Sequence, residues 1–197
     1  MTEQTGVRRP RLSPEEARER ILTAAGEILD ASGYAATTME EIAARAGMAK
    51  KSVYRWWPNR IVLIADLLAR RSTVHTVPDQ GDTRAELLEL IDTIAGYTAG
   101  ADGGQLRLLL GSIDDDPETE RTILARIIEP RRALARTVVQ RGIARGDLPA
   151  DIDVDLLLDL WNGLLTYRSG YRRAPVLRST VQQLVELALA GHTPRLR

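Results

Sequence analysis

Signals that start and stop α-helices recur along this sequence, whereas the alternating apolar pattern of β-strands does not. In SPEEARERILTAAGEILDASG, Ser13 can cap a helix, Pro14 suits its first turn and Glu16 completes a capping box. Gly33 then supplies a stop. Between them runs an apolar stripe at helical spacing, made of Ile21, Leu22, Ala25, Ile28 and Leu29. The chain is therefore predicted to be all-α.

A short helix, a glycine turn and another short helix are predicted next, in TTMEEIAARAGMAKKSVYRWW. Thr38 and Glu41 have capping-box spacing, and Gly47 stands where a tight turn favours a residue that tolerates positive φ. The following helix is expected at about Lys50 to Trp56. This order is that of a helix-turn-helix, whose last helix lies in the DNA major groove with its first residues near base edges.

The start of that last helix carries both lysines of the chain, Lys50 and Lys51. Lysine and serine side chains can contact phosphates or guanine acceptors, and tyrosine and tryptophan can contact the DNA backbone. The lysine pair is also compatible with a solvated helix start, and Val53 and Trp57 are expected in the core. Upstream arginines could enter the minor groove or form a solubilising tail: Arg8, Arg9 and Arg11.

The stretch GYAATTMEEIAARAGMAKKSVYRWWPNRIVLIADLL resembles the DNA-binding domain of the TetR (tetracycline-repressor-like) transcriptional regulators. The resemblance covers Arg18 to about Leu68. It implies that Thr38 caps a helix and contacts phosphate, and that Arg60 holds a phosphate where the family usually has lysine. The implied DNA-binding residues are Thr38, Lys50, Lys51, Ser52, Tyr54, Trp56 and Arg60.

Two departures from the family pattern bear on base preference. Ala49 replaces the usual Ser or Thr cap of the recognition helix, a loss of about 1 kcal/mol. Trp57 replaces the usual Phe. Operator preference is therefore expected to differ from that of relatives that match the pattern more fully.

Helical segments continue after Arg71 and give about nine helices in all, the architecture that the resemblance implies. The expected division is a flexible basic arm at 1–12, a helix-turn-helix domain at 13–58, a connecting helix at 59–75, and an effector-binding and dimerisation domain at 76–197. Helix four is expected near Asn59 to Arg71, and Pro130 is expected to kink a later helix.

The last two predicted helices are apolar around most of their circumference, which indicates two buried faces and hence two neighbours, the domain core and a second subunit. TetR-like regulators dimerise through an equivalent helix pair. The predicted interface residues are Leu157, Leu164, Leu184, Val185 and Ala188.

The resemblance also implies a small-molecule effector inside the second domain. Aromatic and aliphatic walls with a few polar donors suit such sites, although each residue taken singly fits ordinary core better. Gly96 and Gly163 could leave room for a ligand or allow close helix packing. The candidate lining residues are Tyr97, Leu106, Leu110, Trp161, Leu165 and Tyr167.

Charge is divided unevenly along the chain. Residues 1–75 hold 12 Lys and Arg against 9 Asp and Glu, a net of +3, and the remainder holds 15 against 18, a net of −3. A basic front and an acidic back favour two modules with different partners. Without cysteine, an apolar leader or a long apolar run, the chain is expected to be a cytoplasmic protein with no membrane partner.

Catalytic and metal-binding patterns are weak, so we expect neither an enzyme nor a cofactor. Asp114, Asp115 and Asp116 precede Pro117 and are better explained as helix-capping residues than as a cation site. His75 and His192 are far apart without a ligand pattern.

We interpret the chain as a dimeric repressor that binds operator DNA and responds to a small effector. An all-α small-molecule-binding protein without DNA contact is the alternative from another class. An activator would have the same residues.

Overall fold

The computed structural model describes residues 12–71, 76–113 and 116–196. Apart from one isolated antiparallel bridge between Ile152 and Arg195, these residues form helices and loops. The elements are α1 (Pro14–Ala36), α2 (Met39–Ala46), α3 (Lys50–Tyr54), α4 (Arg60–Arg71), α5 (Thr83–Ala99), α6 (Ala101–Leu110), α7 (Pro117–Ile123), η1 (Leu124–Ile128), α8 (Glu129–Arg145), α9 (Val154–Thr166), η2 (Tyr167–Tyr171) and α10 (Arg178–Leu189).

Two of these elements, η1 and η2, are π-helical turns that continue neighbouring α-helices. Because α7, η1 and α8 are contiguous and η2 extends α9, the described residues contain nine continuous helices. The all-α prediction is confirmed. None of the helices in the described ranges is long and apolar enough to cross a membrane.

The chain divides into two compact units, Met1–Leu67 and Leu68–Arg197. In the first unit α1 begins with the predicted capping box. The Ser13 hydroxyl accepts from the Glu16 N–H at 3.2 Å, and a Glu16 carboxylate oxygen accepts from the Ser13 N–H at 2.7 Å. Gly33, at φ 75° and ψ 177°, interrupts the helical backbone as expected. The last turn of α1 therefore follows a kink.

The core of the first unit joins α1, α2, α3 and the start of α4. Trp57 is almost fully buried, and its indole N–H donates to a carboxylate oxygen of Asp66 at 3.1 Å. Arg18 donates to the same oxygen at 3.0 Å, so α1, α4 and the segment after α3 share one polar anchor. The other fully buried large side chains are Ile21, Ile28, Leu29, Ile42, Val53, Leu63 and Ile64. The core positions predicted for Val53 and Trp57 are confirmed.

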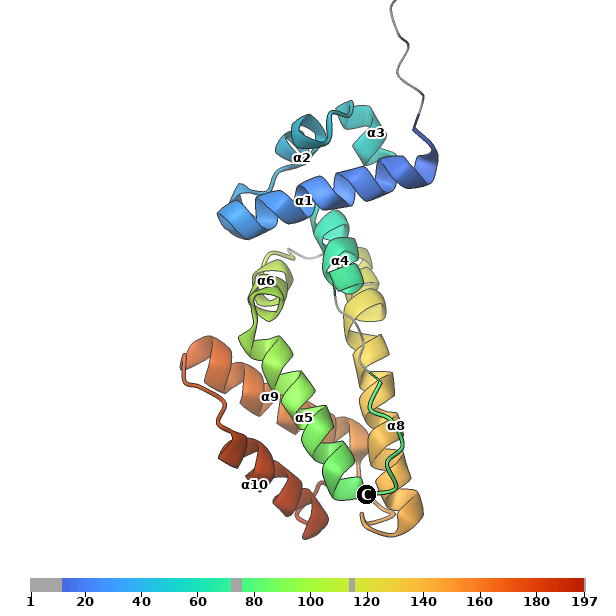
Figure 1. Ribbon diagram of the computed structural model, residues 1–197, viewed down its shortest axis with the longest axis vertical. Helices are drawn as coiled ribbons and strands as arrows, with labels where there is room; N and C mark the ends of the chain where they lie inside the picture. Colours follow the sequence, from blue (N-terminus) through green and yellow to red (C-terminus); the bar gives the residue numbers. More distant parts are fainter. Residues whose placement is uncertain (1–11, 72–75, 114–115, 197) are drawn as a thin grey trace, which may run out of the picture. The chain divides into compact units, whose positions relative to one another are not determined.

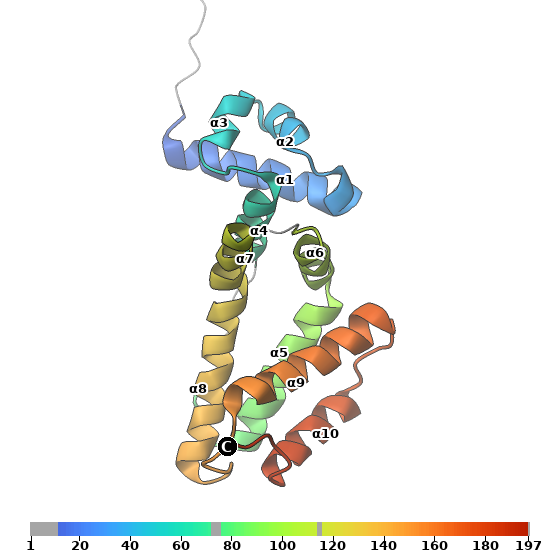
Figure 2. The same cartoon turned by 180° about the vertical axis from the view of Figure 1, so that it is seen from behind.

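In the second unit α5 is the central helix, with α6, α8, α9 and α10 packed against it (Figure 1 and Figure 2). Apolar stripes of α5, α8, α9 and α10 form one continuous core, and burial of these side chains is the main stabilising term. The most buried members include Leu87, Ile91, Val139, Leu158, Leu165 and Val185.

Pro130 is accommodated by a π-helical turn. Proline has no N–H, and its ring collides with the carbonyl four residues earlier in a regular α-helix. In η1 the Glu129 N–H donates to the carbonyl of Leu124, five residues earlier, immediately before the proline. Where a kink was predicted, the structure has a π turn immediately before Pro130, within a continuous helix.

Glu86 is the one charged side chain among the described residues that is fully buried. Its carboxylate accepts from Arg141 at 2.8 Å, from Arg145 at 2.7 Å and from the Gln80 N–H at 2.9 Å. Arg141 also donates to the Val77 carbonyl at 3.0 Å. The cluster therefore fastens the segment before α5 to α8.

Candidate functional site

The helix-turn-helix predicted in the first unit is present. The Thr38 hydroxyl caps α2 by accepting from the Glu41 N–H at 3.1 Å. At the other end of α2, Gly47 adopts φ 64° and ψ 35°, the left-handed conformation that glycine favours. The Met48 N–H donates to the Ala43 carbonyl at 2.9 Å, which closes the turn. α3 then begins at Lys50, and Ala49 provides no side-chain cap.

The start of α3 projects away from the core. Lys50, Lys51 and Tyr54 are exposed, whereas Ser52 and Trp56 are half-buried. Trp56 lies beyond the last residue of α3, so the helix is shorter than the predicted Lys50 to Trp56. Among the candidate DNA-binding residues, five therefore lie on or directly after one short helix.

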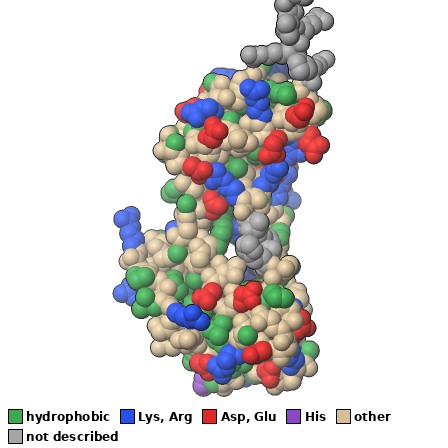
Figure 3. Space-filling view, in the orientation of Figure 1, with side chains coloured by type: hydrophobic (Ala, Val, Ile, Leu, Met, Phe, Trp, Pro, Cys, Tyr) green, Lys and Arg blue, Asp and Glu red, His purple; other side chains and the backbone are tan. Residues whose placement is uncertain are grey.

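Lys50 and Lys51 differ in their surroundings. The Lys50 ammonium lies 2.9 Å from a carboxylate oxygen of Glu40, on α2, and both side chains are more than half exposed. The hydrogen bond from Lys50 holds the pKa of Glu40 below its usual value, so the Glu40 carboxylate is ionised at neutral pH. On the face drawn in Figure 3 basic and acidic side chains are interspersed. Bound DNA must therefore compete with Glu40 for Lys50.

Two arginines near the recognition helix, Arg60 and Arg55, each lie against an aromatic ring. The Arg60 guanidinium lies over the Tyr34 ring, 4.5 Å from its centroid, and donates to the Thr37 carbonyl at 3.4 Å. The Arg55 guanidinium lies 4.4 Å from the centroid of the Trp56 ring. These cation–π contacts limit the orientations of both arginines. Arg55 was not among the predicted site residues.

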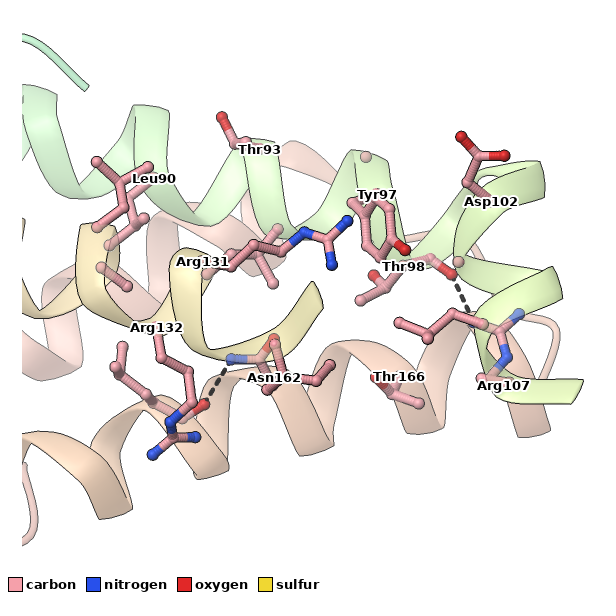
Figure 4. Close-up of a pocket in the computed structure, with 18 of the residues that line it drawn as sticks. Leu90, Thr93, Tyr97, Thr98, Asp102, Arg107, Arg131, Arg132, Asn162 and Thr166 are labelled. Carbon is pink, nitrogen blue, oxygen red and sulfur yellow. Dashed lines mark hydrogen bonds between the residues drawn. The ribbon is translucent and has the colours of Figure 1, made fainter. Parts of the chain in front are cut away.

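A cavity of about 540 Å³ lies in the second unit, between α5, α6, α8 and α9, and is called the Tyr97 cavity below (Figure 4). Its apolar wall consists of Leu90, Ile94, Leu106, Leu110, Ile128, Leu134, Ala135 and Leu158. Its charged and polar lining consists of Arg71, Asp92, Thr93, Tyr97, Thr98, Asp102, Arg107, Arg131, Arg132, Asn162 and Thr166. Gly96 and Gly103 complete the lining. The volume is in the range of about 300–1,000 Å³ typical of small-molecule sites.

Three of the six predicted effector contacts line the Tyr97 cavity, namely Tyr97, Leu106 and Leu110. For the other three the assignment needs correction. Trp161 and Leu165 are buried in the core, and the Tyr167 side chain is exposed. The α9 residues that line the cavity are Leu158, Asn162 and Thr166, one helical face away.

Four arginines in the lining were not predicted, and two of them are neutralised by carboxylates. Arg71 pairs with Asp102 at 3.5 Å. Arg132 forms ion pairs with Asp155 and Asp159 on α9, and these pairs raise its pKa even though burial opposes the charge. The sequence around these four arginines does not show whether each side chain lines a cavity or lies on a solvated surface.

Tyr97 is the most unusual polar residue of the cavity. Its hydroxyl is buried and has no hydrogen-bond partner. The Arg131 guanidinium, from α8, lies 3.8 Å from the centroid of the Tyr97 ring, from α5 (Figure 4). Burial raises the pKa of the phenol, although the Arg131 charge opposes this shift. The phenol is therefore protonated at neutral pH and able to donate.

The apolar surface formed by α9 and α10 differs in detail from the predicted interface. Leu157, Val185 and Ala188 are almost fully buried within their own unit, and Leu157 and Ala188 also line the surface hollow between α9 and α10. Leu164 is exposed and Leu184 is half-buried. The exposed leucines on these two helices, called the α9–α10 face below, are Leu156, Leu160, Leu164 and Leu187. Three of them were not predicted.

Capping explains the acidic residue at the start of α7. Asp116 accepts from the N–H groups of Glu118 and Thr119 at 3.2 and 3.1 Å, which supports the capping interpretation at that position. Asp114, Asp115 and His75 lie outside the described residues, as do Arg8, Arg9 and Arg11. Within the described ranges no group of three or more His, Cys, Asp or Glu side chains is arranged to hold a metal ion.

Residues 77–188 match the family model for the tetracyclin repressor-like C-terminal domain, and residues 21–67 match the model for bacterial regulatory proteins of the tetR family. The chain belongs to the TetR family of transcriptional regulators. TetR-family membership accounts for both the helix-turn-helix and the all-helical second unit. The resemblance stated from the sequence is thereby confirmed.

Similar proteins extend this TetR-family relationship over most of the chain. The HTH-type transcriptional regulator YdeS of Bacillus subtilis, itself uncharacterised, is 29% identical over 185 residues, which cover 93% of each chain. The crystal structure of the TetR-family regulator SCO0332 is 30% identical, with a TM-score of 0.74 over 91% of this chain and 100% of that one. The repressor FadR of Thermus thermophilus, solved with lauroyl-CoA, is 24% identical, with a TM-score of 0.68 over 91% of this chain and 97% of that one.

Proposed function

We propose that this TetR-family regulator is a homodimeric, cytoplasmic repressor that leaves its operator when a small, largely apolar effector fills the Tyr97 cavity. It acts by binding and not by catalysis. In this proposal residues 1–12 form a basic arm and residues 13–58 bind DNA. Residues 59–75 connect the DNA-binding domain to residues 76–197, which bind the effector and the second subunit. The central observation is the exposed start of α3, presented by the capped α2 and the Gly47 turn.

DNA recognition follows from the positions of these side chains. Lys50, Lys51 and Ser52 stand at the first turn of α3, where a recognition helix meets base edges and phosphates. Tyr54 and Trp56 follow, and Thr38 and Arg60 flank the helix pair, where they suit phosphate contacts. These seven residues form the proposed operator-binding surface.

The exposed leucines of the α9–α10 face support the proposal that a second subunit binds there. Leu160 is 55% exposed and Leu187 is 49% exposed. Adjacent leucines line a surface hollow of about 380 Å³ that also includes Gly163 and His192. Exposed apolar residues grouped in this way are typical of an association surface. A two-fold dimer buries the same surface on both subunits.

The size and lining of the Tyr97 cavity support the proposal that an effector binds there. Its wall is mainly apolar, and a few polar groups converge on one ligand-sized space. The FadR structure with lauroyl-CoA supports the idea that this fold can hold a long apolar chain. An effector that binds in this cavity would favour a dimer conformation that fits the operator less well.

The experiment uses a labelled duplex from the DNA upstream of the protein's own coding sequence. Fluorescence anisotropy with the full chain should show saturable binding that exceeds binding to a shuffled duplex. A screen of hydrophobic compounds should then identify one that releases the duplex. Equal binding to both duplexes would contradict the proposed operator and favour a small-molecule-binding protein without regulatory DNA contact.

A matched pair of variants locates the effector. Gly96 lines the cavity, and a Cβ added there would meet nothing within 4 Å, so Gly96→Leu should fill the cavity without a backbone clash. Ala99→Leu adds a leucine to the same helix at an exposed position outside the lining. Release should be weakened in Gly96→Leu and kept in Ala99→Leu. Undiminished release from Gly96→Leu would place the effector elsewhere.

A further inference from the structure

The Tyr97 cavity contains a polar group that the protein leaves unpaired. The Tyr97 hydroxyl is buried and makes no hydrogen bond, although buried polar groups are almost always paired. Since the residue lines the cavity, a bound molecule can supply the missing partner. The phenol is protonated at neutral pH, so it can donate to an acceptor.

The charges around this hydroxyl favour an anionic acceptor. Of the four arginines in the lining, Arg71 and Arg132 are paired with carboxylates, and the other two lie close to the Tyr97 end of the cavity. The Arg131 guanidinium lies against the Tyr97 ring, 3.8 Å from its centroid. Arg107 approaches the same end of the cavity, where its guanidinium donates to the Thr98 carbonyl at 2.7 Å (Figure 4). A carboxylate or phosphate accepts hydrogen bonds without competing as a donor.

The rest of the cavity favours an alkyl chain. Leu106 and Leu110 from α6 and Ile128 and Leu134 from the α7–α8 helix line it together with Leu158 from α9. The π turn η1 ends at Ile128 and places it in the lining three residues before Arg131. One cavity thus combines a polar, positively charged end with an apolar wall.

We propose that the effector is an amphipathic anion, whose carboxylate or phosphate head accepts from the Tyr97 hydroxyl beside Arg131 and whose alkyl chain lies against the leucines. The inference rests on the proposed function, in which this cavity is the effector site. It names the chemistry of the effector, which neither the family nor the DNA-binding face determines.

Isothermal titration calorimetry on the full chain tests this with three ligands that share one alkyl chain: decanoate, decyl phosphate and decanol. At least one anion should bind about tenfold more tightly than the alcohol, because hydrogen bonds to charged groups are stronger than neutral ones. The preferred anion distinguishes a carboxylate head from a phosphate head. Decanol binding as tightly as both anions, or no binding of either anion, would overturn the inference.

Variants assign the head group to its contacts. Tyr97→Phe should weaken binding of the preferred anion about tenfold and weaken decanol binding by a smaller factor. Arg131→Gln should act in the same direction, and Arg121→Gln, an exposed position on the same continuous helix outside the lining, should have no effect. The ligand-free Tyr97→Phe protein should melt at the wild-type temperature or above, because the unpaired hydroxyl is removed. Undiminished anion affinity in Tyr97→Phe would contradict the assignment.

The two proposals fail in different ways. If a neutral compound releases the operator and requires the space beside Gly96, the proposed function stands and the amphipathic anion is wrong. If decanoate or decyl phosphate binds through Tyr97 but never affects operator binding, the cavity chemistry is right and the regulatory role is wrong.

Discussion

Glu40 limits what Lys50 can contribute to DNA binding. In the free protein the two side chains form an ion pair at 2.9 Å that joins α2 to α3. A phosphate must displace the carboxylate, and the carboxylate itself repels the DNA. Lys51 is exposed on the same turn, so the two neighbouring lysines are expected to differ in their contributions.

Glu40→Gln should therefore strengthen binding to any duplex. Releasing Lys50 should steepen the dependence of log K on log salt by up to about 0.9 for each added phosphate contact. Glu41→Gln removes the same charge from the same helix without releasing a lysine, so it controls for net charge. Anisotropy titrations at several salt concentrations measure both variants. Identical slopes for the two would show that the ion pair does not restrain Lys50.

Glu86→Gln should destabilise the second unit at neutral pH. The substitution leaves Arg141 and Arg145 without their buried carboxylate, and such losses typically cost roughly 3–5 kcal/mol. Because these arginines are 21% and 22% exposed, we expect the lower end, about 3 kcal/mol, in the free energy of unfolding by urea.

Glu86→Gln should also change how the stability of the second unit depends on acid pH. Burial alone would raise the pKa of Glu86, but hydrogen bonds from Arg145, Gln80 and Arg141 hold it below the usual value. Because the pKa of Glu86 is lower in the folded than in the unfolded protein, its carboxylate stabilises the folded state at pH values above the unfolded pKa of about 4.3. This stabilisation is lost as the pH falls through the folded pKa. Glu86→Gln should lack this part of the acid sensitivity. A wild type and variant with parallel stability profiles below about pH 5 would contradict the account.

At the residue scale the sequence predicted the caps and the local core well. Ser13, Thr38 and Gly47 were identifiable because their roles depend on residues only three or four positions away. The cavity arginines were not, because an arginine stem packs on apolar surface whether its head lies in a cavity or in bulk water. Arg131 becomes distinctive only when α8 places it on Tyr97 of α5.

At the scale of the helix, the sequence of α9 predicts two apolar faces but does not assign its residues to one face or the other. Leu157, Leu158, Trp161 and Leu165 form one stripe and point into the core. Leu156, Leu160 and Leu164 form a second stripe, spaced by four residues, and point outward. Both stripes have helical spacing, so the pattern indicates two apolar faces but does not show which one meets the core. Tertiary packing decides between them.

Leu160→Asp should abolish dimerisation and leave the subunit folded. Leu160 is 55% exposed, so aspartate is tolerated in the monomer, whereas an unpaired carboxylate in the interface costs several kcal/mol. Leu157→Asp, three residues earlier on the same helix but buried, should instead unfold the second unit. Sedimentation equilibrium and circular dichroism melts separate these outcomes. A stable Leu160→Asp dimer would exclude the α9–α10 face as the interface.

On the scale of the whole molecule, the proposed operator binding and effector binding must be thermodynamically linked. An effector that weakens operator binding must itself bind less tightly to the operator-bound dimer, by the same factor. Typical couplings of 1–3 kcal/mol correspond to about 5–150-fold. Calorimetric titration of the effector into free and operator-bound protein should give this factor, and anisotropy should give it independently. Two factors that disagree would mean that release occurs by some other route.

The central claim is that a dimer of this chain binds DNA through the start of α3, with its recognition helices about 34–36 Å apart on a near-palindromic operator. The most direct measurement is the salt dependence of operator affinity for the wild type and for Lys50→Ala with Lys51→Ala. A dimer loses four lysines, so the slope should fall by up to about 3.6 and the affinity should drop for every duplex. If one lysine reads guanine, discrimination at one operator position should relax as well. Unchanged affinity and an unchanged slope in the double variant would contradict the account.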